Sequence, residues 1–176
     1  MQYLKLLVVV IALSAVTAWA QGPSYKLGKT ATAEEVKTWD TSVGPEGKEL
    51  PAGKGTAAEG EKVFTARGCT WGHGPTGEEG PAPHLVGGGI AGWAFATSIW
   101  DYINRAMPLN HEGSLTPNEV YSLTAYLLNR NKIIQPGDVL DQTTLPKVQM
   151  PNRGRYIAPP VDKWKPGTPR PFKIEP

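Results

Sequence analysis

The stretch Cys69-Thr70-Trp71-Gly72-His73 constrains this 176-residue chain more than any other. Covalent haem attachment uses the pattern Cys-x-x-Cys-His, in which two thiols bond the porphyrin and the adjoining imidazole binds its iron. This chain keeps the first thiol, the spacing and the histidine, but has glycine where the second thiol belongs. Two interpretations follow: a haem site with one thioether, or a site that has lost its cofactor.

The first twenty residues have the composition of a secretory signal. Lys5 supplies a positive start, residues 6–16 form an apolar run, and Ala18-Trp19-Ala20 fits a small-x-small cleavage site. The apolar run is short for a bilayer span, which takes about 20 residues, although an uncleaved anchor stays open. The sequence therefore predicts a cleaved signal peptide over residues 1–20 and export to a bacterial periplasm.

Charge and cysteine content narrow the classes of partner. Without Lys5 the chain has 17 basic and 16 acidic residues, and it has no basic stripe of the kind that binds nucleic acid and no long charge run for a membrane surface. A single cysteine cannot form an internal disulfide. Cys69 must therefore be free, paired with another chain, or used chemically.

Two helices are predicted from their capping boxes. Thr56-x-x-Glu59 opens the first, and Gly68 is placed to end it. Thr116-Pro117-x-Glu119 opens the last, with proline at the first helical position.

A third helix is predicted between them. Ile99, Ile103 and Met107 fall on one helical face, and Pro108 stops the element. Strand alternation is absent, so the predicted class is all-α with long connecting loops.

The two ends of the chain differ in composition from its middle. Residues 21–55 are polar, and nine of the 17 prolines fall in residues 133–176, where they exclude regular helices. That tail should either wrap over the core or reach toward a partner. Three short helices give a small apolar core, which a porphyrin would help to fill at roughly 25 cal/mol per Å² buried.

The order of these motifs resembles that of class I cytochromes c. It runs helix, Cys-x-x-(Gly)-His-Gly, glycine-rich loop, helix, Met-Pro, helix. In that family the first and last helices cross at a small residue and an aromatic, which match Gly60, Phe64 and Tyr126. The resemblance implies three main helices around a haem over residues 56–131. Residues 21–55 and 132–176 would then be irregular N- and C-terminal extensions.

Further segments are similar to one subgroup, the cytochrome subunits of periplasmic sulfite dehydrogenases and related sulfur-oxidation complexes. These segments are Trp39-Asp40, Leu50-Pro51-x-Gly53, Asp101-Tyr102-Ile103-x-Arg105-Ala106-Met107-Pro108, Glu119-Val120-Tyr121-x-Leu123-Thr124-Ala125-Tyr126-Leu127-Leu128 and Leu145-Pro146-x-Val148-x-Met150-Pro151-Asn152-Arg153.

The resemblance implies a site of four residues. Cys69 would hold haem c through a single thioether, and His73 would be the proximal iron ligand. The carbonyl of Pro83 would hold the second imidazole nitrogen, as a ligating histidine requires. Met107, just before the last helix, would supply the sulfur on the opposite iron face, with Met150 in the tail as the alternative.

Other candidate side chains receive no functional role. His84 and His111 are expected to be surface loop residues, with a fallback role as ligands left open. Trp71, Trp93 and Trp100 cluster around the proposed pocket, where aromatic rings are more often simply core.

The expected function is single-electron transfer by the haem subunit of a sulfite dehydrogenase-like complex, rather than catalysis. By resemblance, the electron donor is a molybdenum-cofactor catalytic subunit, and the acceptor is a soluble cytochrome or an oxidase. The sequence has no Ser/His/Asp set, no phosphate-binding glycine loop and no paired carboxylates at a recognisable spacing, so no small-molecule substrate of its own is expected.

Two alternatives remain open. The chain could be a haem-free structural subunit that keeps the fold and its partner-binding tails, which Gly72 favours. It could also be an enzyme with an open axial iron position, which the two available methionines disfavour.

Overall fold

The computed structural model describes residues 28–157, which divide into two units between Thr41 and Ser42. In the first unit, helix α2 (Ala33–Trp39) begins with a capping box between Thr32 and Glu35. The spacing Thr-x-x-Glu of this box is present in the sequence at residues 32–35. The predicted signal over residues 1–20 lies outside the described residues.

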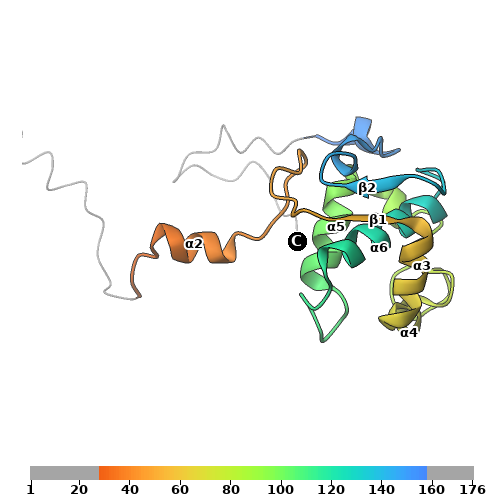
Figure 1. Ribbon diagram of the computed structural model, residues 1–176, viewed down its shortest axis with the longest axis horizontal. Helices are drawn as coiled ribbons and strands as arrows, with labels where there is room; N and C mark the ends of the chain where they lie inside the picture. The colour runs from red at the N-terminus through yellow and green to blue at the C-terminus, as the bar shows by residue number, and fades with distance from the viewer. Residues whose placement is uncertain (1–27, 158–176) are drawn as a thin grey trace, which may run out of the picture. The chain divides into compact units, whose positions relative to one another are not determined.

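The second unit is built on the three predicted helices. These are α3 (Ala57–Ala66), α5 (Ala96–Ala106) and α6 (Pro117–Arg130), with the short α4 (Cys69–His73) following α3 (Figure 1). Both predicted capping boxes form: the Thr56 and Thr116 hydroxyls each accept a hydrogen bond from a backbone N–H in the first turn. The helical class is confirmed, with 3₁₀ turns at Ile90–Gly92 (η1), Leu145–Lys147 (η2) and Arg153–Arg155 (η3).

Helices α3 and α6 cross at the residues that the sequence indicated. A Cβ added at Gly60 would stand 2.6 Å from the Cβ of Tyr126 and 2.5 Å from the carbonyl carbon of Ser122, so glycine permits the close approach. One turn along, the rings of Phe64 and Tyr126 have centroids 5.3 Å apart. The predicted crossing is confirmed.

Two short strands were not predicted. β1 (Lys54–Thr56) pairs antiparallel with β2 (Val139–Asp141), and Lys54 stands opposite Asp141 (Figure 1). The expectation that the chain forms no strand is therefore wrong at this point. Three-residue strands show too little alternation to be detected, and their partner lies on the far side of α6 in the sequence.

The described part of the tail wraps over the core. Leu140, Leu145 and Met150 are at most 4% exposed, and Val43 and Leu50 of the preceding extension are buried with them. All five join the same apolar cluster as the side chains of α5 and α6. The core is therefore larger than the three helices alone would give.

None of the helices within residues 28–157 is both long and apolar enough to cross a bilayer.

Candidate functional site

His73 ends helix α4, and its imidazole is held by the loop that follows. Nδ1 lies 2.9 Å from the carbonyl oxygen of Pro83, so the neutral tautomer that donates this hydrogen bond keeps Nε2 as an acceptor. The resemblance implied this contact. The role of His73 as an iron ligand stays a prediction.

The loop returns to α4 because glycines allow a very close approach. Gly74 has φ +77°, a left-handed conformation that turns the chain away from the helix. A Cβ at Gly80 would stand 2.6 Å from the backbone nitrogen of Gly74, and closer still to the carbonyl of Gly72. The N–H of Ala82 then donates to the Gly72 carbonyl at 2.9 Å. This packing sets the position of Pro83 beside the imidazole.

Cys69 begins α4, four residues before His73, so the two side chains lie on one side of the helix. The residue is half-buried, and its side chain packs against the main apolar cluster. Burial raises the pKa of the thiol, which keeps it protonated at neutral pH. A protonated, half-buried thiol does not suit a nucleophile, and Cys69 faces the core, where an apolar cofactor would be placed.

Gly72 occupies the place of the missing thiol without any steric need for glycine. A Cβ there would meet the Cβ of Ala82 at 3.5 Å, an ordinary van der Waals contact, and the backbone is not in the left-handed region. The fold therefore accommodates a side chain at residue 72.

The two candidate methionines differ in their surroundings. Met107 is the C-cap of α5, is partly buried, and packs against the apolar cluster. Met150 is 4% exposed and is itself part of that cluster. The fully packed Met150 is a core residue, whereas Met107 keeps part of its surface outside the core.

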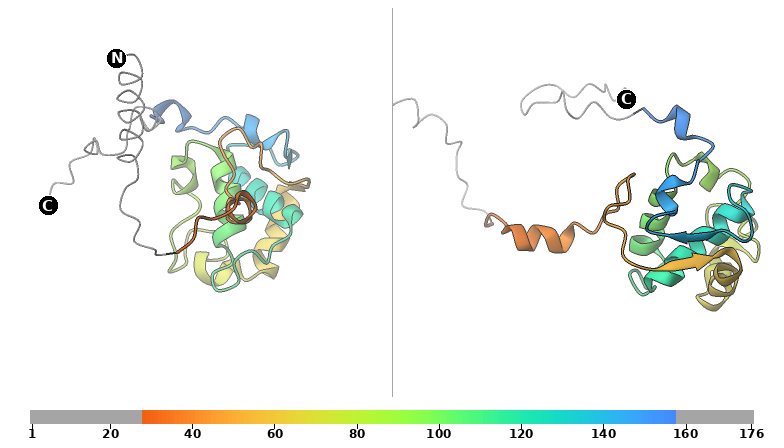
Figure 2. Two further views of the ribbon diagram at one scale, coloured as in Figure 1. Left: turned by 90° about the vertical axis from the view of Figure 1, so that its left-hand side faces the viewer. Right: turned by 45° about the horizontal axis from the view of Figure 1, so that its top comes forward.

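Met107 opens the loop between α5 and α6, and this loop lies at the same end of the body as α4 (Figures 1 and 2). Cys69 and Met107 also pack against one cluster. The elements that carry a thiol, an imidazole and a thioether thus lie at one end of the body, and the thiol and the thioether contact the same apolar cluster. This donor set fits a haem, for which imidazole and thioether are the axial ligands of electron-transfer cytochromes.

A further observation supports the fit. Trp100 is 1% exposed, and its indole N–H has no hydrogen-bond partner among the described residues. Buried polar groups without partners are rare and call for an explanation. Trp100 lies within α5, seven residues before Met107, the C-cap of that helix. A haem propionate is an acceptor that would satisfy the indole.

Asp101 was not predicted as a site residue, and it fixes α5 in place. Its carboxylate accepts a hydrogen bond from the Val43 N–H at 2.9 Å and two more from the guanidinium of Arg105. The Arg105 pairing follows from the i, i+4 spacing, but the bond to Val43 joins residues 58 apart and has no sequence signal.

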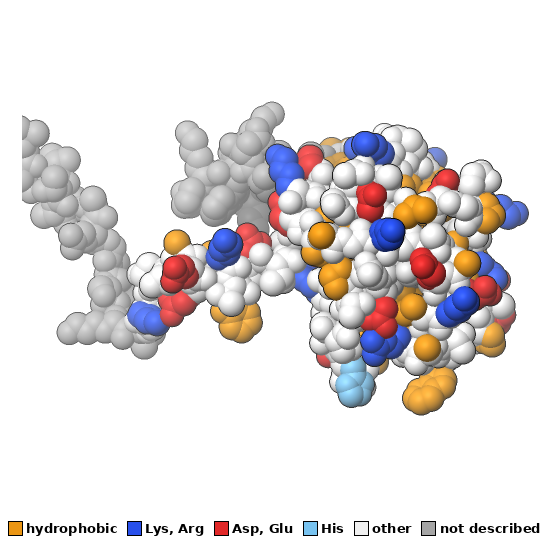
Figure 3. All heavy atoms as spheres, in the orientation of Figure 1, with side chains coloured by type: hydrophobic (Ala, Val, Ile, Leu, Met, Phe, Trp, Pro, Cys, Tyr) orange, Lys and Arg blue, Asp and Glu red, His pale blue; other side chains and the backbone are white. Residues whose placement is uncertain are grey.

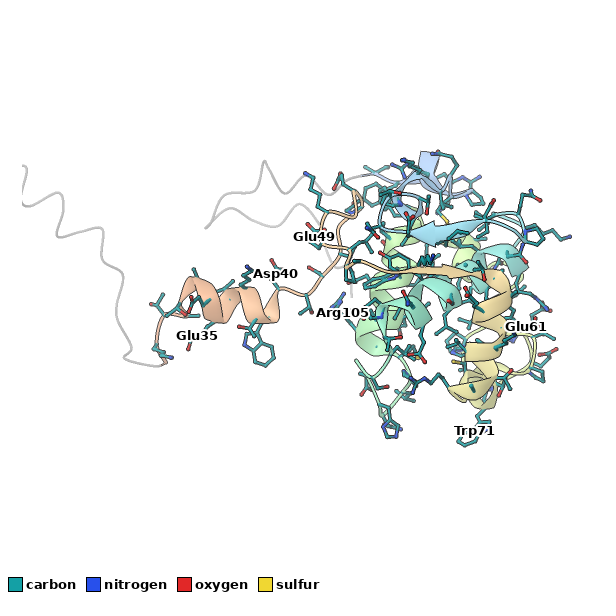
Figure 4. All side chains as sticks on the ribbon, in the orientation of Figure 1. Glu35, Asp40, Glu49, Glu61, Trp71 and Arg105 are labelled. Carbon is teal, nitrogen blue, oxygen red and sulfur yellow. The ribbon has the colours of Figure 1, made fainter. Side chains whose placement is uncertain are left out.

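The remaining candidates lie at the surface. His84 and His111 are exposed, as expected for loop residues. Trp71 is 87% exposed and projects outward from α4 (Figure 4), so the interpretation of this tryptophan as a core residue is wrong. Among residues 28–157, no three His, Cys, Asp or Glu side chains come together as ligands for a bare metal ion.

Comparison with known proteins gives one informative similarity. No family model matches the sequence, and no curated protein matches it. A chain of the crystal structure of the sulfane dehydrogenase SoxCD from Paracoccus pantotrophus is 27% identical, with a TM-score of 0.65. The alignment covers 87% of this chain and 86% of that chain. This chain is therefore similar to that protein in sequence and in fold over most of its length.

Proposed function

We propose that the chain is a class I cytochrome c-like subunit of a periplasmic sulfur-oxidising dehydrogenase complex. In this proposal it binds one haem through a single thioether at Cys69 and transfers single electrons. The hydrogen bond between His73 Nδ1 and the Pro83 carbonyl is the observation that carries the proposal, because a backbone acceptor on Nδ1 directs Nε2 toward a metal.

Each residue of the site has a separate task. His73 presents Nε2 in a fixed tautomer, and the Gly74–Pro83 loop keeps the imidazole from rotating. Met107 offers a thioether from the end of α5, and the buried Trp100 N–H offers a donor for a carboxylate. When bound, haem supplies one-electron chemistry between ferric and ferrous iron, and a thioether ligand raises its reduction potential.

The similarity to a sulfane dehydrogenase chain supports the role in sulfur oxidation. We extend it to the partners that the sequence resemblance implies: a molybdenum-cofactor catalytic subunit as electron donor, and a soluble cytochrome or oxidase as acceptor. The chain itself would then carry electrons without binding a small-molecule substrate. The signal-like sequence of residues 1–20 supports the periplasmic location.

The mass of the protein tests the covalent bond. We expect protein purified from a host with haem-attachment machinery to gain the mass of one haem, which persists after denaturation, and to lose this gain in Cys69→Ala. Met107→Leu should change the low-spin reduced spectrum, because leucine has a similar volume but no sulfur. Met150→Leu is the matched control and should leave the spectrum unchanged. An unmodified, colourless wild-type protein refutes the proposal.

A haem-free structural subunit is the second candidate, and the packing of the core favours it. Leu140, Leu145 and Met150 fill space that the helices leave, so part of the core is made without a cofactor. Cooperative unfolding of colourless protein that still binds a partner subunit would support this role.

A further inference from the structure

A surface groove of about 400 Å³ is lined by none of the four residues of the candidate haem site. Residues 92–95 and Ser98, ahead of and within α5, line one side. Asn152 and residues 155–157, the last described part of the tail, line the other. Three of the lining side chains are aromatic: Trp93, Phe95 and Tyr156.

Specific contacts hold the two sides together. The Asn152 side-chain amide donates to the Gly92 carbonyl at 2.6 Å, across 60 residues of sequence. The rings of Phe95 and Tyr156 meet edge to face with centroids 4.9 Å apart, and the Arg153 guanidinium lies 4.9 Å from the Phe95 ring centre. These contacts fix the two sides of the groove relative to each other.

The charge of the groove is positive. Arg155 lines it, Arg153 adjoins it, and none of the described lining residues is acidic. Figure 3 shows Lys and Arg side chains along the edge of the body where η3 lies in Figure 1. From residue 147 onward the sequence has seven basic and two acidic residues, whereas the rest of the chain has eleven basic and fourteen acidic ones.

We infer that this groove binds an acidic, extended segment of a partner protein. Aromatic walls offer apolar surface for side chains such as proline or tryptophan, and the two arginines pair with carboxylates. The chain's own residues 158–176 are a poor occupant, because they carry four basic against two acidic residues and share the sign of the groove. A concave site with three aromatic rings also suits a peptide better than the flat surface of a bilayer.

The inference rests on the proposed function only for the existence of a protein partner. The groove and the haem site use different residues, so the two proposals can fail separately. Peptide binding tests the groove, and the mass of the protein tests covalent haem attachment.

Fluorescence anisotropy with labelled peptides tests the inference on the full mature chain. The probe is the acidic peptide EEWPEEW, and its matched control has lysine in place of each glutamate. We expect the acidic peptide to bind and the basic one not to bind. Raising the ionic strength from about 0.01 M to about 0.15 M shortens the Debye length from about 30 Å to about 8 Å. This screening should weaken binding of the acidic peptide at least about threefold.

Variants distinguish peptide binding in the groove from non-specific attraction by the net charge of the protein. Arg155→Glu should weaken binding about fivefold, and Tyr156→Ala by a similar factor at every ionic strength. Lys62→Glu changes the net charge by the same amount as Arg155→Glu, at an exposed residue of α3. The affinity of this variant for the acidic peptide should stay within about twofold of that of wild type. Circular dichroism of each variant verifies that it is folded.

Three results would overturn the inference. One is equal binding of the acidic and basic peptides. Another is an equal loss in Lys62→Glu and Arg155→Glu. The third is binding to phosphatidylglycerol vesicles or to oligo(dT) that is tighter than peptide binding and falls in Arg155→Glu, which would assign the surface to a membrane or to nucleic acid.

Discussion

Replacing Gly60 by alanine tests the close crossing of α3 and α6. The new Cβ would stand 2.6 Å from the Cβ of Tyr126 and 2.5 Å from the carbonyl carbon of Ser122. Carbon atoms pack at about 3.5–4.0 Å, so the two helices must separate by about 1 Å at this point. Neither opposing atom can move aside by a change of rotamer, because one is a backbone carbon and the other is a Cβ, whose position the backbone fixes.

The magnitude follows from two opposed effects. Inserting a methyl group into a packed core costs about 1–3 kcal/mol, and separation of the helices also weakens the Phe64–Tyr126 contact, an aromatic pair of about 0.5–1.5 kcal/mol. Alanine in a helix gains about 1 kcal/mol over glycine. We therefore expect a net loss of about 0.5–3.5 kcal/mol in the free energy of unfolding, or a fall in Tm of about 2–14 °C.

Urea unfolding followed by far-UV circular dichroism measures this difference. The matched control is Gly72→Ala, also a glycine in a helix, where the new Cβ meets Ala82 at 3.5 Å. We expect this control to be unchanged or more stable by up to about 1 kcal/mol. The reasoning fails if Gly60→Ala is as stable as wild type, or if Gly72→Ala loses as much.

Three further changes have definite expected outcomes. Gly72→Cys should allow a second thioether, which keeps the mass gain at one haem but moves the pyridine haemochrome band to shorter wavelength; an unmoved band would contradict this. Hydrogen bonds, first from Thr143, lower the pKa of Asp141 to about 2. Its contribution to stability is therefore present above the unfolded pKa of about 3.9 and lost as the pH falls toward 2. In Asp141→Asn, the urea concentration at the unfolding midpoint should therefore fall less steeply than in wild type between about pH 4 and pH 2. An equal fall in the variant and in wild type would contradict this role of Asp141. Asp101→Ala leaves the buried Val43 N–H without its acceptor and should cost about 1–3 kcal/mol in urea unfolding, whereas a loss under about 0.5 kcal/mol would argue against this bond.

The helices could be predicted because their signals are local. A capping box spans four residues, and Thr56 and Thr116 each precede a glutamate at the required spacing. The Gly60 crossing followed from the resemblance, and the structure gives its reason in the space beside Tyr126.

The strands and the additional core could not be predicted, since they depend on distant partners. The pairing of Lys54 with Asp141 joins two strands that α3, α5 and α6 separate in the sequence. The burial of Leu145 likewise depends on its contact with the apolar cluster around α5 and α6, and a proline-rich sequence shows no periodicity that would indicate it.

The candidate site divides in the same way. The Cys69–His73 spacing is visible in the sequence, whereas Pro83 came only from the resemblance, because a carbonyl acceptor has no residue signature. The unpartnered nitrogen of Trp100 and the exposure of Trp71 depend on distances that a sequence does not contain.

The pairing of β1 with β2 has a mechanical consequence. The chain enters β1 at Lys54 and leaves β2 at Asp141, and these two residues stand opposite each other. Opposed tension on the two ends of the body would therefore load this ribbon from one end and peel its hydrogen bonds in succession, instead of shearing them all at once. In a single-molecule pulling experiment, the segment anchored by Leu145 would detach first, the ribbon would then open at low force, and the crossed helices would yield last.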